Sequence, residues 1–327
     1  MGRVGRALTW EAWLLIINVA VIALFANMVV GFAQSPAVLN VSRALTILGI
    51  IAVGQSLVMA AGGVDLSVGS IFGFAAVLLA ILYKLGYGFG IMLLAGVGAG
   101  CFIGIINGLS VTKLGFKPFI ATFAMMIALR AIAYFTMKGT IGLAAQGVTG
   151  TVWTDLVRVQ SPLWLYPSFF ILLVAAVGGW WLLNNTRFGS WARGTGGNLN
   201  AARAVGVPVD RVRIITYVAS GALAAVAGML NVGDIQGVRT FDGAGMELLS
   251  LAAVIIGGAS LAGGSASILG TLLAVLLISL VKVGVSLMGI ALWYQQIITG
   301  AVLLAALVLT RLSLRRGIAR TEKELTK

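Results

Sequence analysis

Residues 184–213 read NNTRFGSWARGTGGNLNAARAVGVPVDRVR, a polar and basic segment in a chain that is otherwise almost entirely apolar. The segment contains five arginines and one aspartate, although charged residues make up only 9% of the 327 residues. Apolar runs at 163–183 and 214–231 flank it, and each is long enough to cross a hydrocarbon core of ~30 Å as a helix. The pattern therefore predicts a membrane protein in which 184–213 is an aqueous loop.

The rest of the chain repeats this pattern of long apolar runs. Hydrophobic residues are 60% of the sequence, above the roughly 45–50% of soluble domains. Helices are the expected form, because backbone groups in lipid must hydrogen-bond within their own segment, and the alternation of membrane strands is absent. We therefore predict an all-α integral membrane protein with one domain, 1–327, and about ten transmembrane helices. The predicted spans are 12–32, 44–61, 67–83, 89–111, 119–137, 163–183, 214–231, 247–262, 266–286 and 292–310.

The positions of the basic residues indicate which loops face the cytoplasm. With the N-terminus inside, fifteen of the 22 Lys and Arg are cytoplasmic, five are outside, and Arg130 and Lys282 lie within spans. This asymmetry follows the positive-inside tendency. Both termini, the loop 184–213 and the tail 311–327 are therefore predicted to be cytoplasmic. Topology and anionic lipid headgroups explain the net charge of +13, so no nucleic-acid partner is expected.

The sequence lacks the residues of most catalytic and metal sites. It has no histidine and one cysteine, Cys101, which cannot build a zinc or haem site. No Gly-Lys pair occurs, so a phosphate-binding loop is absent, and the nine carboxylates are not paired for acid–base catalysis. We therefore expect no catalytic residue, no metal and no cofactor in this chain. A pore or a carrier is the remaining class.

Glycines mark several places where the spans break or pack closely. Residues 61–70 (AGGVDLSVGS) lie between the second and third spans, and residues 257–265 (GGASLAGGS) lie between the eighth and ninth. Both are predicted to be glycine-rich breaks. In the fourth span, small residues at regular intervals predict a face for close helix packing. These residues are Gly96, Gly98, Gly100, Gly104 and Gly108.

Four polar residues within or beside the spans are predicted members of a translocation pathway. If the first break lies at membrane depth, the Asp65 carboxylate must be paired or face a cavity; otherwise Asp65 lies in cytoplasmic water and caps the third helix. Arg130 lies well inside the fifth span, where a guanidinium needs a partner or a water-filled route. Asn107 could bond a neighbouring helix or a sugar hydroxyl, and Glu247 suits the N-terminus of the eighth span. A purely structural role is the alternative for each.

Within the loop, a short helix is predicted. Asn198 is a suitable N-cap, residues 199–205 form an alanine-rich body, and Gly206 is a suitable stop. Two capped helical turns outside the bilayer would form a compact peg. The alternative is a surface helix that rests on lipid headgroups.

These segments resemble the permease subunits of bacterial ABC importers for monosaccharides of the ribose, xylose and arabinose type. That family has Thr-Arg-Phe-Gly followed by Gly-Gly-Asn-x-x-Ala-Ala, which stand here at 186–189 and 196–202. Residues 62–69 (GGVDLSVG) agree at every position with the family's Gly-Gly-[Ile/Val]-Asp-Leu-Ser-Val-Gly. Residues 118–122 (PFIAT) and Arg130 also match. The resemblance covers roughly residues 45–310.

The resemblance implies a mechanism in which this chain does not hydrolyse ATP. A periplasmic binding protein would deliver a monosaccharide to two permease subunits in the bacterial inner membrane. A separate cytoplasmic ATP-binding subunit, which binds the ATP and magnesium, would hold the loop helix and drive alternating access. The loop residues implied in this contact are Arg193, Gly196, Gly197, Asn198, Ala201, Ala202, Arg203 and Gly206.

The chain departs from the family pattern at Leu249, at Ala131 and in the outer loop 138–162. These departures concern the identity of the sugar rather than the mechanism. Two other functions stay open. One is a ten-span secondary carrier of the drug/metabolite type, and the other is a channel-like structural subunit. The sequence does not indicate which sugar is carried, or whether the permease pair is a homodimer.

Overall fold

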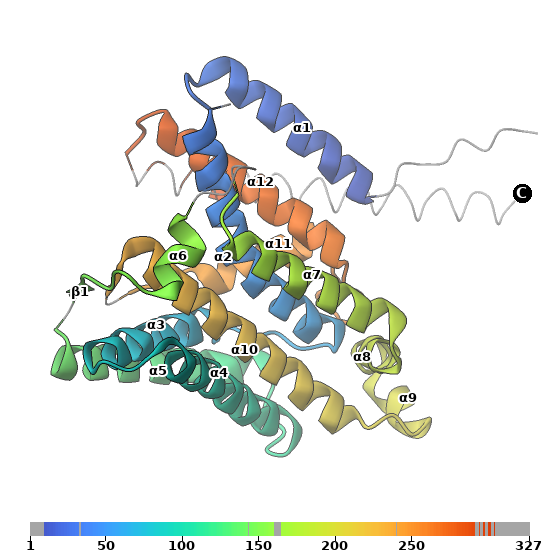
Figure 1. The fold of residues 1–327 in the computed structure, drawn as a ribbon. Coiled ribbons are helices and arrows are strands. Elements are labelled where there is room, and N and C mark those ends of the chain that lie inside the picture. Colours follow the sequence, from blue (N-terminus) through green and yellow to red (C-terminus); the bar gives the residue numbers. More distant parts are fainter. Residues whose placement is uncertain are drawn as a thin grey trace, which may run out of the picture.

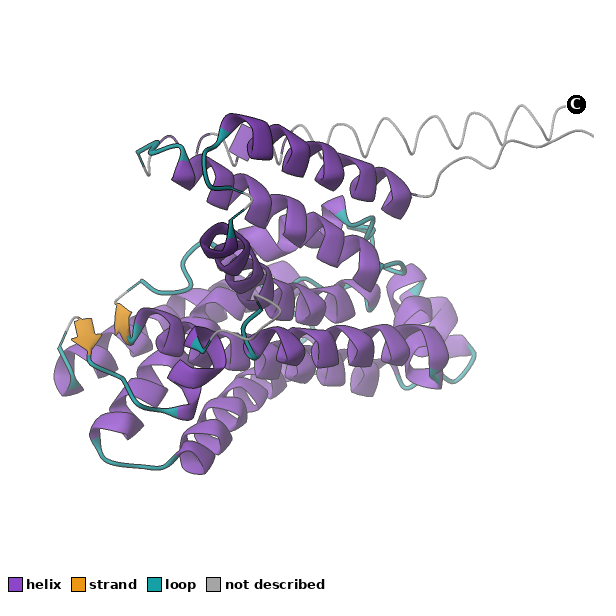
Figure 2. Ribbon diagram, turned by 45° about the horizontal axis from the view of Figure 1, so that its top comes forward, coloured by secondary structure: helices purple, strands orange, loops and turns teal. Residues whose placement is uncertain are grey.

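A computed structural model of the chain describes residues 10–32, 34–142, 144–159, 165–239 and 241–291, together with 294, 297, 300, 301 and 304. This part of the chain is almost entirely helical (Figures 1 and 2). Seven of its helices are long and apolar enough to cross a membrane. They are α1 Trp10–Met28, α2 Ser35–Ala60, α4 Phe89–Thr112, α5 Pro118–Thr140, α7 Ser168–Asn185, α10 Val209–Ile235 and α12 Ile268–Leu287.

Two further apolar helices are shorter than a span. Helix α3 (Val68–Lys84) matches the predicted third span, whereas α11 (Met246–Ile256) covers only part of the predicted span 247–262. Its eleven residues measure about 16 Å, roughly half of a hydrocarbon core. The glycines that follow Ile256 end the helix. The predicted span 292–310 and the tail 311–327 lie almost wholly outside the described residues, so the number of ten spans stays a prediction.

The remaining elements are short and lie at the two ends of the helices. Helix α6 (Val152–Arg158) and an antiparallel pair of strands, β1 (Ala144–Gln146) and β2 (Gly237–Arg239), lie at one end. Helices α8 (Arg187–Gly197) and α9 (Leu199–Ala204) lie at the other end (Figure 1).

Helix α10 is central and extends between the two ends. It packs against α2, α3 and α4 along its length. Near its start Val212 packs with Ala192 of α8, and near its end Gly233 lies against the Trp153 backbone of α6. Gly233 follows Val212 by 21 residues, which correspond to about 32 Å of helix, so α10 connects the two ends across a distance comparable to a membrane.

The glycine face predicted for the fourth span is confirmed. A side chain at Gly100, Gly104 or Gly108 of α4 would meet the backbone of α10, and one at Gly96 would meet Met229. The prediction is wrong at Gly98, which has nothing within 4 Å, because only every fourth residue lies on this face of the helix. Small residues therefore let α4 and α10 approach closely.

Candidate functional site

The central loop folds into two helices where one was predicted. The predicted helix is confirmed as α9, and the Oδ1 atom of its N-cap Asn198 accepts a hydrogen bond from the Ala201 amide at 3.0 Å. Gly206 follows with a φ of 80°, which suits glycine and ends the turn. Helix α8 was not predicted, although Thr186 caps it through the Gly189 amide at 3.2 Å. Its glycines and polar residues hid it from a search for apolar periodicity.

Helix α9 has one face against the protein and one face outside it. Ala202 is buried, whereas Ala201 and Val205 are exposed. Val205, at the end of the helix, is 80% exposed. The exposed face is thus partly apolar although it lies in the most polar segment of the chain. Such a face is suited to contact with another protein or with lipid headgroups, the two alternatives for this helix.

Charged residues hold the α8–α9 segment to the rest of the molecule. The Asp210 carboxylate at the start of α10 pairs with Lys113 at 2.8 Å and with Arg203 of α9 at 3.3 Å. Arg193 of α8 donates to Asn184 at 2.6 Å. Each exposed pair contributes little stability alone, but together they fix α9 relative to α10 and to the loop after α4.

A contact between glycines joins this segment to both glycine-rich breaks. We call it the glycine junction; it consists of Gly62, Gly196, Gly263 and Gly264. A Cβ atom on Gly62 would lie 3.0 Å from the Gly196 Cα, and one on Gly263 would lie 2.6 Å from the Gly62 Cα. The Gly264 amide donates to the Ala60 carbonyl at 3.2 Å. Three segments that are distant in sequence therefore meet through their backbones, where side chains would not fit.

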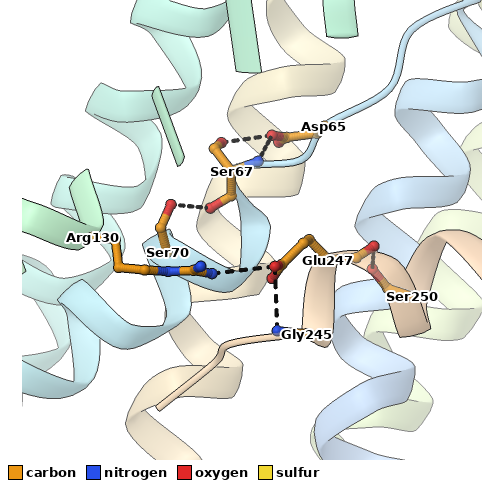
Figure 3. A network of polar contacts seen from close by, with 7 residues as sticks. All are labelled: Asp65, Ser67, Ser70, Arg130, Gly245, Glu247 and Ser250. Atoms are coloured by element: carbon orange, nitrogen blue, oxygen red, sulfur yellow. Dashed lines mark hydrogen bonds and ion pairs between the residues drawn. The ribbon is translucent and has the colours of Figure 1, made fainter. Parts of the chain in front are cut away.

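The carboxylate of Asp65 is buried in a polar cluster, where it faces Ser67 at the start of α3 (Figure 3). Its Oδ1 accepts from the Ser67 amide at 3.0 Å and from the Ser67 hydroxyl at 2.6 Å, and its Oδ2 accepts from the Ser220 hydroxyl at 3.0 Å. Asn107 donates to the Ser67 hydroxyl oxygen at 2.8 Å. Asp65 is 0% exposed, so the alternative in which it lies in water is wrong. Its bond to the Ser67 amide does hold the start of α3.

Arg130 and Glu247 form an ion pair that the sequence did not reveal. Arg130 Nη2 of α5 lies 3.2 Å from Glu247 Oε1 of α11, and that oxygen also accepts from the Gly245 amide at 3.3 Å. The Glu247 side chain is 8% exposed and the Arg130 side chain 32%. A side chain at Gly69 would collide with the Glu247 carboxylate, so α3 and α11 are close there.

All four predicted pathway residues therefore meet around the first turn of α3. Ser67 is the N-cap of this helix and contacts Asp65 and Asn107. Gly69, two residues later, lies against Glu247, which binds Arg130. The Ser70 hydroxyl donates to the Ser67 carbonyl at 2.8 Å and tightens the turn (Figure 3). Among the described residues, no group of three His, Cys, Asp or Glu could hold a metal ion.

Sequence reasoning missed two members of this cluster. Ser67 lies within the segment GGVDLSVG, but no function was predicted for it. Ser220 is one of several small polar residues in α10. Serine is tolerated in membrane helices because it can bond its own backbone, so its presence alone carries no signal.

The fold and this polar centre define a multi-pass helical membrane protein with charged residues buried among its spans. Residues 37–307 match the family model described as "Branched-chain amino acid transport system / permease component", and the chain belongs to this family of permeases. The resemblance to monosaccharide ABC importer permeases is thereby confirmed at the level of the family and its relatives.

Several curated relatives are similar over most of their length. The ribose import permease protein RbsC of Escherichia coli (strain K12) is 32% identical over 317 residues, which cover 93% of this chain and 96% of the relative. RbsC of Bacillus subtilis (strain 168) is 34% identical over 280 residues, 86% of each chain. The autoinducer 2 import system permease protein LsrC of E. coli (strain K12 / DH10B) is 34% identical over 281 residues, 84% of this chain and 80% of the relative. No solved structure matches the chain.

Proposed function

We propose that this chain is the membrane-spanning, non-catalytic subunit of an ATP-driven importer that carries a monosaccharide across the bacterial inner membrane. The similarity to ribose import permeases over more than nine-tenths of the chain supports the substrate class. The observation that carries the ATP-driven part is α9, a capped helix outside the spans whose exposed face is apolar at its end. In this proposal both chain termini and α9 face the cytoplasm.

The proposal requires three partners. A cytoplasmic ATP-binding subunit binds the α8–α9 segment, including Arg193, Gly197, Asn198 and Ala201. A second permease subunit completes the pathway, and a periplasmic sugar-binding protein delivers the monosaccharide to the outer face. ATP and magnesium are bound by the ATPase, and the chain itself needs no cofactor.

The glycine junction supplies a physical link from the ATPase to the pathway residues. A displacement of α8 acts directly on Gly62 and Gly263, because these residues are in backbone contact with Gly196. The break after Gly62 leads within a few residues to Asp65 and the first turn of α3. Packed backbones transmit a displacement without the slack of flexible side chains. Closure of the ATPase would therefore move the turn around which Asp65, Asn107, Arg130 and Glu247 gather.

A secondary carrier of the drug/metabolite type is the alternative. Such a carrier has no need for a rigid helix with an exposed apolar end outside the membrane. The match of residues 37–307 to a transport-system permease family and the similarity to ribose import permeases favour the importer.

Co-purification tests the proposal. The tagged chain is expressed with a candidate ATP-binding subunit from the same genome, solubilised in mild detergent and isolated through its tag. We expect the ATPase to be retained in a stable complex whose ATP hydrolysis is sensitive to vanadate. A chain that is folded and monodisperse but retains no ATPase would contradict the proposal.

A further inference from the structure

A second polar site lies at the end of the helices opposite α8 and α9. It is a cavity of about 270 Å³ between α2, α10, α11 and α12. Its polar side chains come from the first third of α2, the last turns of α10 and the second half of α12. This volume is near the lower limit of ~300–1,000 Å³ for sites that hold small molecules. The polar side chains are Asn40, Arg43, Asn231, Asp234, Ser279 and Lys282.

An ion pair in the wall of the cavity is held in a fixed position. Arg43 Nη1 lies 2.8 Å from Asp234 Oδ1, and Arg43 Nη2 donates to the Tyr166 hydroxyl at 2.7 Å. The guanidinium carbon also stands 4.7 Å from the centroid of the Tyr166 ring, in cation–π contact. A charged pair on two spanning helices is costly to bury and is usually retained for a function.

Other polar side chains in the wall have no partner. Within the described part of the chain, Asn40, Asn231 and Lys282 make no hydrogen bond or ion pair. Each asparagine offers two donors and one acceptor oxygen, and the lysine offers three donors. The wall is completed by apolar residues that include Ile47, Met246 and Leu249. The cavity thus combines free donors and acceptors with apolar surface.

We infer that this cavity is a binding site for an uncharged monosaccharide on its way through the permease, an inference that rests on the proposed function. Sugar hydroxyls donate and accept at once, as the side chains of Asn40 and Asn231 do. The C–H faces of a sugar ring suit the apolar wall. The charge of Arg43 is already neutralised by Asp234, and the unpaired Lys282 is exposed, so a neutral ligand leaves no buried charge without a partner.

The cavity is separated from the pathway residues by one turn of α11. Met246 and Leu249 line the cavity, whereas Glu247 between them turns to Arg130 and Gly69. The sugar site and the ion pair Arg130–Glu247 therefore lie on opposite faces of the same helix turn. A sugar that leaves the cavity would pass this turn when α11 moves.

Cysteine labelling tests sugar binding in the cavity directly, without a transport assay. Cys101 is the single cysteine of the chain and does not line the cavity, so Cys101→Ala gives a cysteine-free background. Ala44→Cys, in the apolar part of the cavity wall, is introduced into the full chain, which is assembled with its partners in phospholipid nanodiscs and treated with a small methanethiosulfonate reagent. A bound sugar blocks access to the cysteine, so the labelling rate falls as the site becomes occupied. At a sugar concentration of roughly ten times the dissociation constant, we expect the rate to fall about tenfold.

We expect ribose, xylose or arabinose to protect Ala44→Cys from the reagent. The control Thr149→Cys, in an exposed loop outside the cavity, should be labelled at the same rate with and without sugar. Protection by none of these sugars at high millimolar concentration would overturn the inference. Equal or stronger protection by ribose 5-phosphate would also overturn it, because the site would then bind anions.

Transport separates this inference from the proposed function. In the reconstituted importer, Asn231→Leu and Asp234→Asn should reduce sugar uptake by about tenfold or more, while ATPase binding stays intact. Asn27→Leu is the matched control, since Asn27 is an exposed residue of α1 outside the cavity. Uptake at the wild-type rate in both cavity variants would refute the sugar site alone. If the wild-type importer carries no sugar with ATP, the proposed function fails, and the labelling experiment still decides on the cavity.

Discussion

At the scale of single residues, Asp65 is the acceptor on which three buried donors depend. These donors are the Ser67 amide, the Ser67 hydroxyl and the Ser220 hydroxyl. Buried donors without an acceptor cost about 1–3 kcal/mol each, and a rotating hydroxyl recovers part of that cost. We therefore expect Asp65→Ala to destabilise the protein by about 2–4 kcal/mol, and Asp65→Asn by less, because its oxygen still accepts.

Thermal unfolding in detergent, followed by intrinsic fluorescence, measures the effect of Asp65. Asp155→Ala on α6 is the control, since its side chain is exposed and makes no hydrogen bond among the described residues. It should change the unfolding temperature little. An Asp65→Ala variant that unfolds at the wild-type temperature would show that the cluster does not hold α3.

The pair Arg130–Glu247 gives a second prediction at this scale. Arg130→Met leaves the Glu247 carboxylate, 8% exposed, with only the Gly245 amide. Breaking a buried pair costs about 3–5 kcal/mol, and we expect about 2 kcal/mol here because Arg130 is partly exposed. Adding Glu247→Gln should restore at least half of the loss, since the amide carries no charge to desolvate.

The same unfolding assay distinguishes this pair from an exposed one. Lys113→Met breaks the ion pair with Asp210. The Lys113 side chain is 62% exposed and the Asp210 side chain 32%, so the variant should lose no more than about 1 kcal/mol of stability. If the double variant Arg130→Met/Glu247→Gln is less stable than Arg130→Met alone, the two residues do not act as a pair.

The sequence predicted the charged members of this site, because charged residues are rare within the apolar runs. Asp65, Arg130 and Glu247 were found because a charged group in an apolar run needs an explanation. Their partners were not found, because Ser67, Ser220 and Gly69 are ordinary in membrane helices. Which charge meets which follows from the packing of α3, α5 and α11, and spacing along the chain does not reveal it.

At the scale of elements, α9 is predicted to be the contact for the ATPase. Val205→Glu and Ala201→Glu place a charge on its exposed face, whereas Ala202 faces the protein and is unsuitable for this test. We expect either variant to reach the membrane normally but to reduce the amount of co-purified ATPase by about tenfold, as for a buried interface charge without a partner.

The control for α9 is Val152→Glu. Val152 is a 45% exposed valine on α6, at the opposite end of the molecule. It should leave ATPase binding unchanged. Normal ATPase retention by Val205→Glu and by Ala201→Glu would place the contact elsewhere.

The glycine junction gives a further test at this scale. A Cβ atom on Gly196 would collide with the Ala60 carbonyl and the Gly264 amide, whereas one on Gly194 meets nothing within 4 Å. We expect Gly196→Ala to cost about 1–3 kcal/mol through overpacking and to impair ATP-driven uptake. Gly194→Ala, in the same helix, should stabilise it by about 0.5–1 kcal/mol. Equal unfolding temperatures for the two variants would contradict the close contact.

Element boundaries show where sequence patterns succeed and fail. Long apolar runs located seven spanning helices to within a few residues at most ends, although α2 begins nine residues before its predicted start. Its first turns contain Ser42 and Arg43, which interrupt the apolar pattern but remain helical through tertiary contacts. Helix α11 ended earlier than predicted because its run of apolar residues continues into glycines.

At the scale of the whole molecule, the two ends of the helices have different properties. One end carries α8 and α9 (Figure 1), which meet the glycine junction. The polar cavity with Arg43 and Asp234 lies at the other end, beside the last turns of α10. Between them stands the first turn of α3 with its buried charges. The cavity at one end, the buried charges in the middle and α9 at the other end are consistent with the proposed importer, in which sugar enters at one end and the ATPase binds at the other. The positive-inside count predicts the same orientation.

The most direct measurement is sugar uptake by the importer reconstituted in proteoliposomes with its ATPase, its second permease subunit and its loaded binding protein. The account predicts uptake of labelled ribose or another monosaccharide that requires ATP on the side of α9, stops with vanadate and disappears with Val205→Glu. Uptake by this chain alone, driven by an ion gradient without ATP, would contradict it.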